Sequence, residues 1–350
     1  MGRRLALGIV LATVGVIQPA LAVQVDNFEL IDHRGDAHEL YYYSDATAVV
    51  LMVQGNGCPI VRNALPDLRA VRDTYEQKGV AFLMINSNLQ DHRDSIAAEA
   101  EEWNIDLPIL DDAAQLIGEG LGLTRTAEVL VIDPRTWTLA YRGPINDRLS
   151  YERQKEKASE HYLAEVLDAV IGGDAIASSD TTRAAQGCLI NFVARNEDHS
   201  RISYAETIAP LLADRCAGCH VEGGIGPWAM SSYEMVLGFA PMIREVVRTQ
   251  RMPPWHADPH VGTWADDRGL SKEQRQAVVH WIEAGAPRGD GPDPLALAAE
   301  QRVDGSEWPL GPPDLGLELP DEHVPASGIV DYTLSRIHIS EPTRLHCISY

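Results

Sequence analysis

The chain has 350 residues, of which 45% are hydrophobic, so it is long enough to form two ordinary domains with buried cores. Its formal net charge of −22 at pH 7 disfavours binding to nucleic acids and to anionic membrane surfaces, because both would repel it. The same charge would attract a basic partner protein, although an acidic excess usually serves only to keep a surface soluble.

The N-terminus has the features of a secretory signal peptide. Arg3 and Arg4 precede an apolar run from Leu5 to Ile17, and the small-residue site Ala20-Leu21-Ala22 follows. The alternative is a retained anchor, but the run is shorter than the roughly 20 residues that span a bilayer. We therefore expect cleavage of residues 1–22, no membrane span in the mature chain, and a periplasmic or secreted protein in a compartment that permits disulfides.

Strands and helices alternate through residues 23–173. Short apolar runs predict strands at 47–53, 80–86, 107–110, 129–132 and 139–142, and amphipathic segments predict helices at 59–77, 91–103, 113–121 and 159–171. This alternation predicts an α/β domain whose central sheet is covered by helices on both faces.

Cys58 lies where the first strand meets its helix, in the sequence GNGCPIVR. A thiol at a helix N-terminus is close to unpaired backbone amides, which stabilise the thiolate and lower the thiol pKa. The order of the elements and this turn resemble the thioredoxin-like redoxins. The resemblance implies a thiol-redox fold with Cys58 at the active position.

Three features depart from the redoxin pattern. Position 61 is Val61, so the second cysteine of a thioredoxin C-x-x-C pair is missing. Leu51 and Gly55 occupy the proline and threonine positions of the peroxiredoxin motif P-x-x-x-T-x-x-C, and Thr126-Ala127-Glu128 replaces the proline that redoxins place opposite the active cysteine. Cys58 is therefore either a reactive thiol or a small buried hydrophobic residue without a chemical role.

Residues 174–201 change to small, polar and charged side chains and predict a linker that carries Cys188 in the sequence QGCLI. Some exported redoxin-like proteins end with a G-C-x-I segment after an N-terminal C-P cysteine. That resemblance implies a pair between Cys58 and Cys188. The pair would be either a catalytic and resolving couple or a structural disulfide that closes about 130 residues.

The most specific motif is Cys216-Ala217-Gly218-Cys219-His220, because C-x-x-C-H is the attachment signature of a c-type haem. Two thiols at this spacing can each bond to a haem vinyl group, and the adjacent histidine then meets the iron. We therefore expect covalently bound haem c, with Cys216, Cys219 and His220 as cofactor-binding residues and His220 as an iron ligand.

A chance C-x-x-C, a dithiol redox pair and half of a zinc site are the alternatives for these cysteines. Zinc would require a second pair of ligands at a suitable spacing. The remaining cysteines are scattered singly, at Cys58, Cys188 and Cys347.

Residues 202–290 predict a small all-α domain, with helices at 204–215, 232–248 and 271–284 and a glycine-rich loop at 223–227. The order of these elements matches a class I cytochrome c fold. With its RMPPWH and AGAP sequences, this segment resembles cytochrome c-like modules that are fused to redoxin or copper-monooxygenase domains. The resemblance implies Met252 as the sixth iron ligand. The competing residues are Met230, Met235, Met242, His256 and His260.

Two segments complete the chain. Residues 291–335 resemble the first strands of a copper type II monooxygenase-like domain, which implies a truncated third domain without copper-site histidines. Residues 336–350 resemble translated sequencing-adapter read-through, so we expect a non-native tail.

These features together predict an exported multidomain redox protein that exchanges electrons with a partner protein through haem c, coupled to thiol-disulfide chemistry at Cys58. Two alternatives remain open. The first is a periplasmic thiol oxidoreductase or peroxidase that uses Cys58, with the haem as its electron outlet. The second is an inert redoxin scaffold that positions a cytochrome for a downstream oxygenase.

Overall fold

The computed structural model describes residues 23–149, 154–174, 176, 181–192, 201–254, 257–258, 260–265 and 267–301. The chain divides into two units, Met1–Ala299 and Glu300–Tyr350, and nearly all of the described residues belong to the first. The expected signal peptide, His256, the expected strands of the third domain and the tail all lie outside the described residues. None of the described helices is both long enough and apolar enough to span a bilayer.

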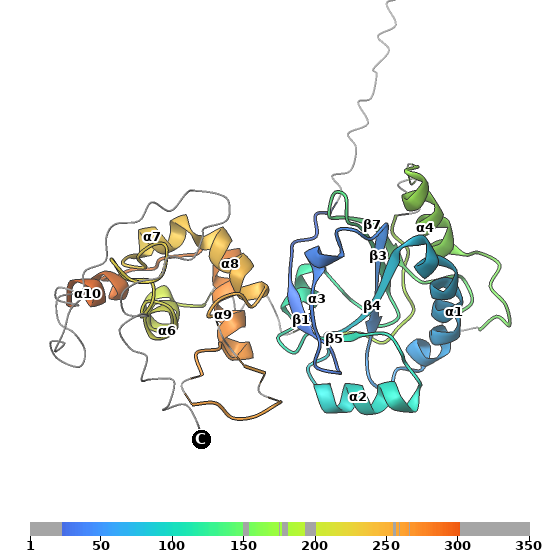
Figure 1. Ribbon diagram of the computed structural model, residues 1–350, viewed down its shortest axis with the longest axis horizontal. Coiled ribbons are helices and arrows are strands. Elements are labelled where there is room, and N and C mark those ends of the chain that lie inside the picture. Colours follow the sequence, from blue (N-terminus) through green and yellow to red (C-terminus); the bar gives the residue numbers. More distant parts are fainter. Residues whose placement is uncertain are drawn as a thin grey trace, which may run out of the picture. The chain divides into compact units, whose positions relative to one another are not determined.

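The N-terminal region is built on a five-stranded sheet with the strand order β5-β4-β3-β6-β7 (Figure 1). The strands β3 Ala48–Gln54, β4 Val80–Asn86 and β5 Ile109–Asp111 are parallel. β6 Val129–Asp133 is antiparallel to β3, and β7 Thr138–Gly143 is antiparallel to β6. Every residue of β3 is buried, as expected for the central strand of a sheet that is covered on both faces.

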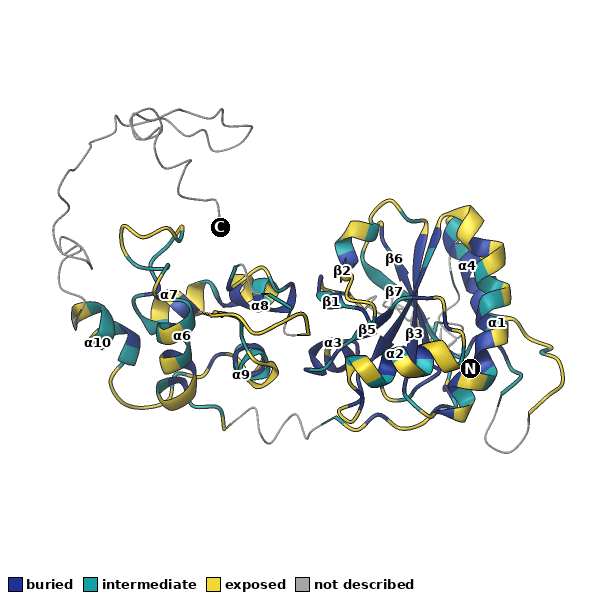
Figure 2. Ribbon diagram, turned by 60° about the horizontal axis from the view of Figure 1, so that its bottom comes forward, coloured by how far each residue is buried: buried dark blue, intermediate teal, exposed yellow. Residues whose placement is uncertain are grey.

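Alternate side chains of β3 enter two different cores. Val50 and Met52 pack with buried residues of α1 Pro59–Tyr75, α2 Arg93–Glu102 and α4 Tyr162–Gly172. Val49 and Leu51 belong to the core on the opposite face, with residues of α3 Leu116–Gly120. In Figure 2 the central strand β3 is dark blue, whereas the outer surface of α2 carries many exposed positions.

The strands and helices expected in this region are confirmed, each shifted by a few residues at most. The 3-10 turn η2 Glu76–Lys78 replaces the end of the first expected helix. The hairpin of β1 Glu29–Ile31 and β2 Ala37–Glu39, and the 3-10 turn η1 Leu40–Tyr43, were not expected. Strands of three residues are too short to produce a recognisable alternation of apolar and polar side chains.

The described elements after residue 200 are all helical. They are η4 Tyr204–Ile208, which is a π-helical turn, α6 Ala209–Arg215, α7 Tyr233–Gly238, α8 Ala240–Arg248, α9 Lys272–Glu283 and α10 Pro294–Gln301. The capping box of Ser271 and Gln274 at the start of α9 is confirmed. Trp281 of α9 is fully buried and stacks on Tyr204, with 5.7 Å between the ring centroids.

One expectation for this region needs correction. The single helix expected at 232–248 is broken at Phe239, because Pro241 in the first turn of α8 has no N–H and cannot extend the hydrogen bonds of α7. The described part of residues 291–335 contains the helix α10, and the strands expected in this segment lie outside the described residues.

Candidate functional site

Cys58 caps the N-terminus of α1, as expected. Its backbone is extended, Pro59 occupies the first helical position, and only 2% of Cys58 is exposed. The preceding turn requires glycine at two positions. Gly57 has a φ of +71°, and a Cβ atom at Gly55 would lie 2.6 Å from both Asn88 Nδ2 and Thr126 Cγ2.

The structure brings Cys58 and Cys188 together. The Cys188 thiol donates a hydrogen bond to the Cys58 Sγ at 2.9 Å, and both cysteines are free. The Thr126 Oγ1 is 3.0 Å from the Cys58 Sγ and accepts a hydrogen bond from the Cys188 N–H at 2.9 Å. Since that bond leaves the hydroxyl hydrogen available, Thr126 can donate it to the Cys58 sulfur. Thr126 therefore contacts both cysteines.

The two thiols differ in acidity. Burial alone would raise the pKa of Cys58, but hydrogen bonds from Cys188, Thr126 and the Val61 amide outweigh it and lower the pKa. Burial and the neighbouring Cys58 sulfur raise the pKa of Cys188. Cys58 is therefore the stronger acid and the better candidate for a thiolate nucleophile.

Carboxylates of α2 and of the preceding loop hold the Cys58 turn. Glu99 Oε2 accepts the Gly57 N–H at 2.5 Å, and Asp91 Oδ2 accepts the Asn56 N–H at 3.0 Å. Gln54 Nε2 also donates to Glu99 Oε1, at 2.8 Å. This network is absent from the sequence-based predictions. The sequence feature that could have indicated this network is the polar residue at the end of each central strand, Gln54 in β3 and Asn86 in β4.

A separate, strongly apolar cavity lies in the helical region. It contains about 680 Å³ of space that no protein atom occupies, and this figure includes open solvent. The helical-region residues that line it are Leu211, Leu212, Cys216, His220, Pro227, Trp228, Met230, Met242, Ile243, Val246, Val247, Met252, Pro253, Leu270 and Val278.

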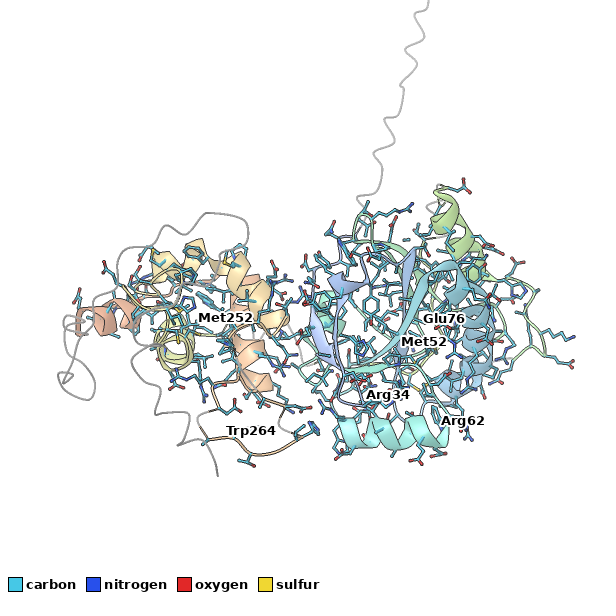
Figure 3. All side chains as sticks on the ribbon, in the orientation of Figure 1. Arg34, Met52, Arg62, Glu76, Met252 and Trp264 are labelled. Atoms are coloured by element: carbon cyan, nitrogen blue, oxygen red, sulfur yellow. The ribbon has the colours of Figure 1, made fainter. Side chains whose placement is uncertain are left out.

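Three of the four expected haem residues line this cavity: Cys216, His220 and Met252, the last of which is labelled in Figure 3. Cys219 is not among the lining residues. His220 Nδ1 lies 3.1 Å from the Trp228 carbonyl oxygen, so an Nδ1–H can donate there and leave Nε2 free as a ligand. A Cβ atom at Gly226 would lie 2.7 Å from His220 Nδ1, so the glycine lets the loop approach the ring.

The residues that compete with Met252 as an iron ligand lie at different places in the structure. Met230 and Met242 also line the cavity, whereas Met235 does not. His260 lines a different cavity together with Arg93 and Asp111.

Burial and the neighbouring Cys219 raise the pKa of Cys216 to about 11, which disfavours a thiolate nucleophile there. Among the described residues, no three His, Cys, Asp or Glu side chains are grouped as a metal site.

Comparison with known proteins identifies the N-terminal region. Residues 21–147 match the model of the AhpC/TSA family. This region is an AhpC/TSA redoxin domain. The thioredoxin-like α/β fold expected there is thus confirmed, and the fold indicates a thiol-redox function. No protein of curated function matches the chain.

Several solved structures resemble part of the redoxin-containing chain. A hypothetical protein from Sinorhizobium meliloti 1021 is 25% identical over 51% of this chain and 97% of its own, with a TM-score of 0.44. The peroxidoxin BcpB from Mycobacterium tuberculosis is 19% identical over 43% of this chain and 93% of its own, with a TM-score of 0.32. A thiol:disulfide interchange protein from Chlorobium tepidum TLS is 15% identical over 44% of this chain and 100% of its own, with a TM-score of 0.35. None of these matches identifies a cytochrome c domain, so that expectation stays a prediction.

Proposed function

We propose that the redoxin domain is a thiol-disulfide oxidoreductase in which Cys58 is the attacking thiolate and Cys188 is the resolving thiol. The observation that carries this proposal is the 2.9 Å separation of two sulfurs whose pKa values are shifted in opposite directions. Thr126 and the Val61 amide stabilise negative charge on the Cys58 sulfur. The less acidic Cys188 remains protonated until it attacks the mixed disulfide.

The reaction is two successive thiol-disulfide exchanges. The Cys58 thiolate attacks one sulfur of a partner disulfide, forms a mixed disulfide, and releases the other partner sulfur as a thiolate. Cys188 then loses its proton and attacks the Cys58 Sγ, which forms the Cys58–Cys188 disulfide and releases the second partner sulfur. Two electrons pass from the cysteine pair to the partner. One partner sulfur takes up the proton that Cys188 loses, and the other takes one from solvent, which received the Cys58 proton when the thiolate formed. The reverse sequence oxidises a partner dithiol.

Peroxide reduction by Cys58 is the second enzymatic candidate, and the same variants test both activities. We expect Cys58→Ser to abolish reduction of a model disulfide. Cys188→Ser should still form the mixed disulfide but stop after one turnover. A higher turnover with hydrogen peroxide than with the disulfide would favour the peroxidase. Unchanged disulfide turnover in Cys58→Ser would show that Cys58 is not the catalyst and would favour the inert redoxin scaffold.

We also propose that the helical region binds haem c covalently through Cys216 and Cys219, and that His220 and Met252 would hold its iron. The apolar cavity that His220 and Met252 share supports this proposal, as does the free Nε2 of His220. When bound, the haem would supply a one-electron redox centre. Trp228 orients the His220 ring through its carbonyl oxygen, and the apolar lining would exclude water.

The haem proposal has a direct spectroscopic test. Protein matured with haem-attachment machinery should give a c-type reduced-minus-oxidised spectrum that survives denaturation, and Cys219→Ala should largely remove the covalent haem. A full-length protein that matures without stoichiometric haem and instead binds zinc tightly would contradict it.

We further propose that the protein is exported to the periplasm or the cell exterior, where haem attachment and disulfides belong. Its acidic charge suits a basic redox partner protein, with which the haem would exchange electrons. Export is tested by whether Val23 is the first residue of protein recovered from a periplasmic extract.

A further inference from the structure

The linker forms a short strand pairing with the redoxin domain beside Cys58. The Thr126 N–H donates to the Cys188 carbonyl at 2.9 Å, and the Ile190 N–H donates to the Thr124 carbonyl at 3.0 Å. Leu189 lies antiparallel to Arg125 in the same pairing. Because these bonds join backbone groups, the bonds themselves do not select particular side chains.

The residue before the cysteine is restricted much more tightly. Gly187 is buried, and a Cβ atom at this position would lie 1.6 Å from the Thr126 carbonyl oxygen. Arg125 Nη1 donates to the Gly187 carbonyl at 3.1 Å. Any side chain here would push the strand away from Thr126. The edge therefore accepts a cysteine only when glycine precedes it.

The linker strand also covers the reactive sulfur. Cys58 is 2% exposed with residues 187–190 in place, whereas Leu189 is 70% exposed. Ile190 is buried, and Gln115 Nε2 donates to the Asn191 carbonyl at 3.0 Å, which holds the far end of the strand. A partner sulfur can reach Cys58 from the side that Cys188 now occupies only after residues 187–190 have moved away.

We propose that residues Thr124–Thr126 are a docking edge for an extended Gly-Cys segment, that residues 187–190 occupy this edge in cis, and that a Gly-Cys peptide of a partner protein competes with them for it. This inference rests on the proposed reactivity of Cys58 and adds a sequence preference for the partner. The linker thereby acts both as the resolving strand and as a competitor of the partner.

The test uses the full-length holoprotein with Cys188→Ser, so that no resolving step follows. The probe is the peptide AQGCLINF, which reproduces residues 185–192, with its cysteine joined to thionitrobenzoate through a disulfide. The Cys58 thiolate attacks the peptide sulfur, forms the mixed disulfide and releases coloured thionitrobenzoate. The matched control peptide is AQACLINF, and protein carrying both Cys58→Ser and Cys188→Ser supplies the blank.

We expect the glycine peptide to react about tenfold faster than the alanine peptide, because the alanine peptide cannot keep both backbone hydrogen bonds. Adding Gly187→Ala to the Cys188→Ser protein should displace the linker and speed the reaction of the glycine peptide several-fold. Glutathione joined to thionitrobenzoate serves as the reference disulfide, because it has no strand to dock. Its rate with each variant also reports whether Cys58 remains intact.

The outcomes separate the two proposals. Equal rates for the two peptides, with a normal rate for the glutathione reference, would overturn the docking edge and leave the thiol chemistry of Cys58 standing. A Gly187→Ala protein that reacts normally with the reference but no faster with the glycine peptide would overturn the cis competition. No reaction with any disulfide would overturn the proposed function and the inference together.

Discussion

At the scale of single residues, Thr126 has a role that the sequence pattern does not reveal. The pattern marks its position only as the place of a missing proline, yet its hydroxyl contacts the Cys58 sulfur and the Cys188 amide. Local sequence cannot predict this contact, because the residues are separated by 68 and 62 positions and meet only in the folded sheet.

Thr126→Val tests this role by replacing the hydroxyl with a methyl group of similar size. Without its hydrogen bond the pKa of Cys58 should rise, so alkylation of Cys58 near neutral pH should slow by about threefold or more. The alkylation rate is measured against pH in a Cys188→Ser background, and the midpoint of this curve reports the pKa of Cys58. Thr126→Ser keeps the hydroxyl and should leave the midpoint unchanged. If the Val and Ser variants titrate alike, Thr126 does not stabilise the thiolate.

At the scale of secondary-structure elements, the sequence predicts the five strands of the main sheet and the helices that cover it. The apolar run of β3 and the amphipathic pattern of α1 are enough to predict that Cys58 lies at their junction. The break between α7 and α8 and the hairpin of β1 and β2 could not be read from periodicity, since one depends on a single proline and the other has strands of three residues.

The helix α2 should stabilise the Cys58 turn through Glu99. Glu99→Ala removes the acceptor of the Gly57 and Gln54 N–H groups, so we expect the free energy of unfolding to fall by about 1–3 kcal/mol. The alkylation rate of Cys58 should also change, because its turn loses support. Chemical denaturation and alkylation of the purified protein measure both effects. The neighbouring Glu101→Ala removes the same charge from an exposed position of α2 and should alter neither.

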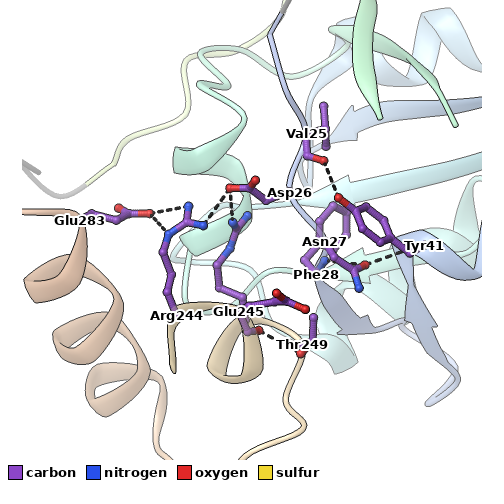
Figure 4. Close-up of polar contacts among 10 residues, drawn as sticks. Val25, Asp26, Asn27, Phe28, Tyr41, Arg244, Glu245, Thr249 and Glu283 are labelled. Atoms are coloured by element: carbon purple, nitrogen blue, oxygen red, sulfur yellow. Dashed lines mark hydrogen bonds and ion pairs between the residues drawn. The ribbon is translucent and has the colours of Figure 1, made fainter. Parts of the chain in front are cut away.

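At the scale of the whole molecule, charged groups connect segments that are distant in the sequence. Asp26 accepts hydrogen bonds from Arg244 at 2.8 Å and from Arg248 at 3.2 Å, and Arg244 also pairs with Glu283 (Figure 4). Burial alone would raise the pKa of Asp26, but the two arginines outweigh it and lower the pKa. The side chain of Arg248 is 4% exposed, so losing its partner should be costly.

Asp26→Asn should therefore lower the free energy of unfolding at pH 7 by about 1 kcal/mol or more. Because the folded-state pKa of Asp26 is lowered, its contribution is fully present above the usual Asp value of about 3.9 and is lost as the pH falls through the folded value. The difference between variant and parent should thus shrink in acid. Asp45→Asn, at an exposed position, is the control for the change in charge. An equal loss in both variants, or a difference that persists in strong acid, would contradict the role of Asp26.

The central claim is that Cys58 and Cys188 form a reactive dithiol, and its most direct test is their redox equilibrium. The full-length protein is equilibrated in glutathione buffers of graded potential, quenched with an alkylating reagent, and mapped for the peptide that links the two cysteines. We expect this linked peptide to appear with a midpoint potential of about −200 mV, which is typical of a couple that exchanges electrons with other thiols. A midpoint below about −300 mV would indicate a structural disulfide, and two cysteines that stay alkylated separately in every buffer would show that the pair does not form.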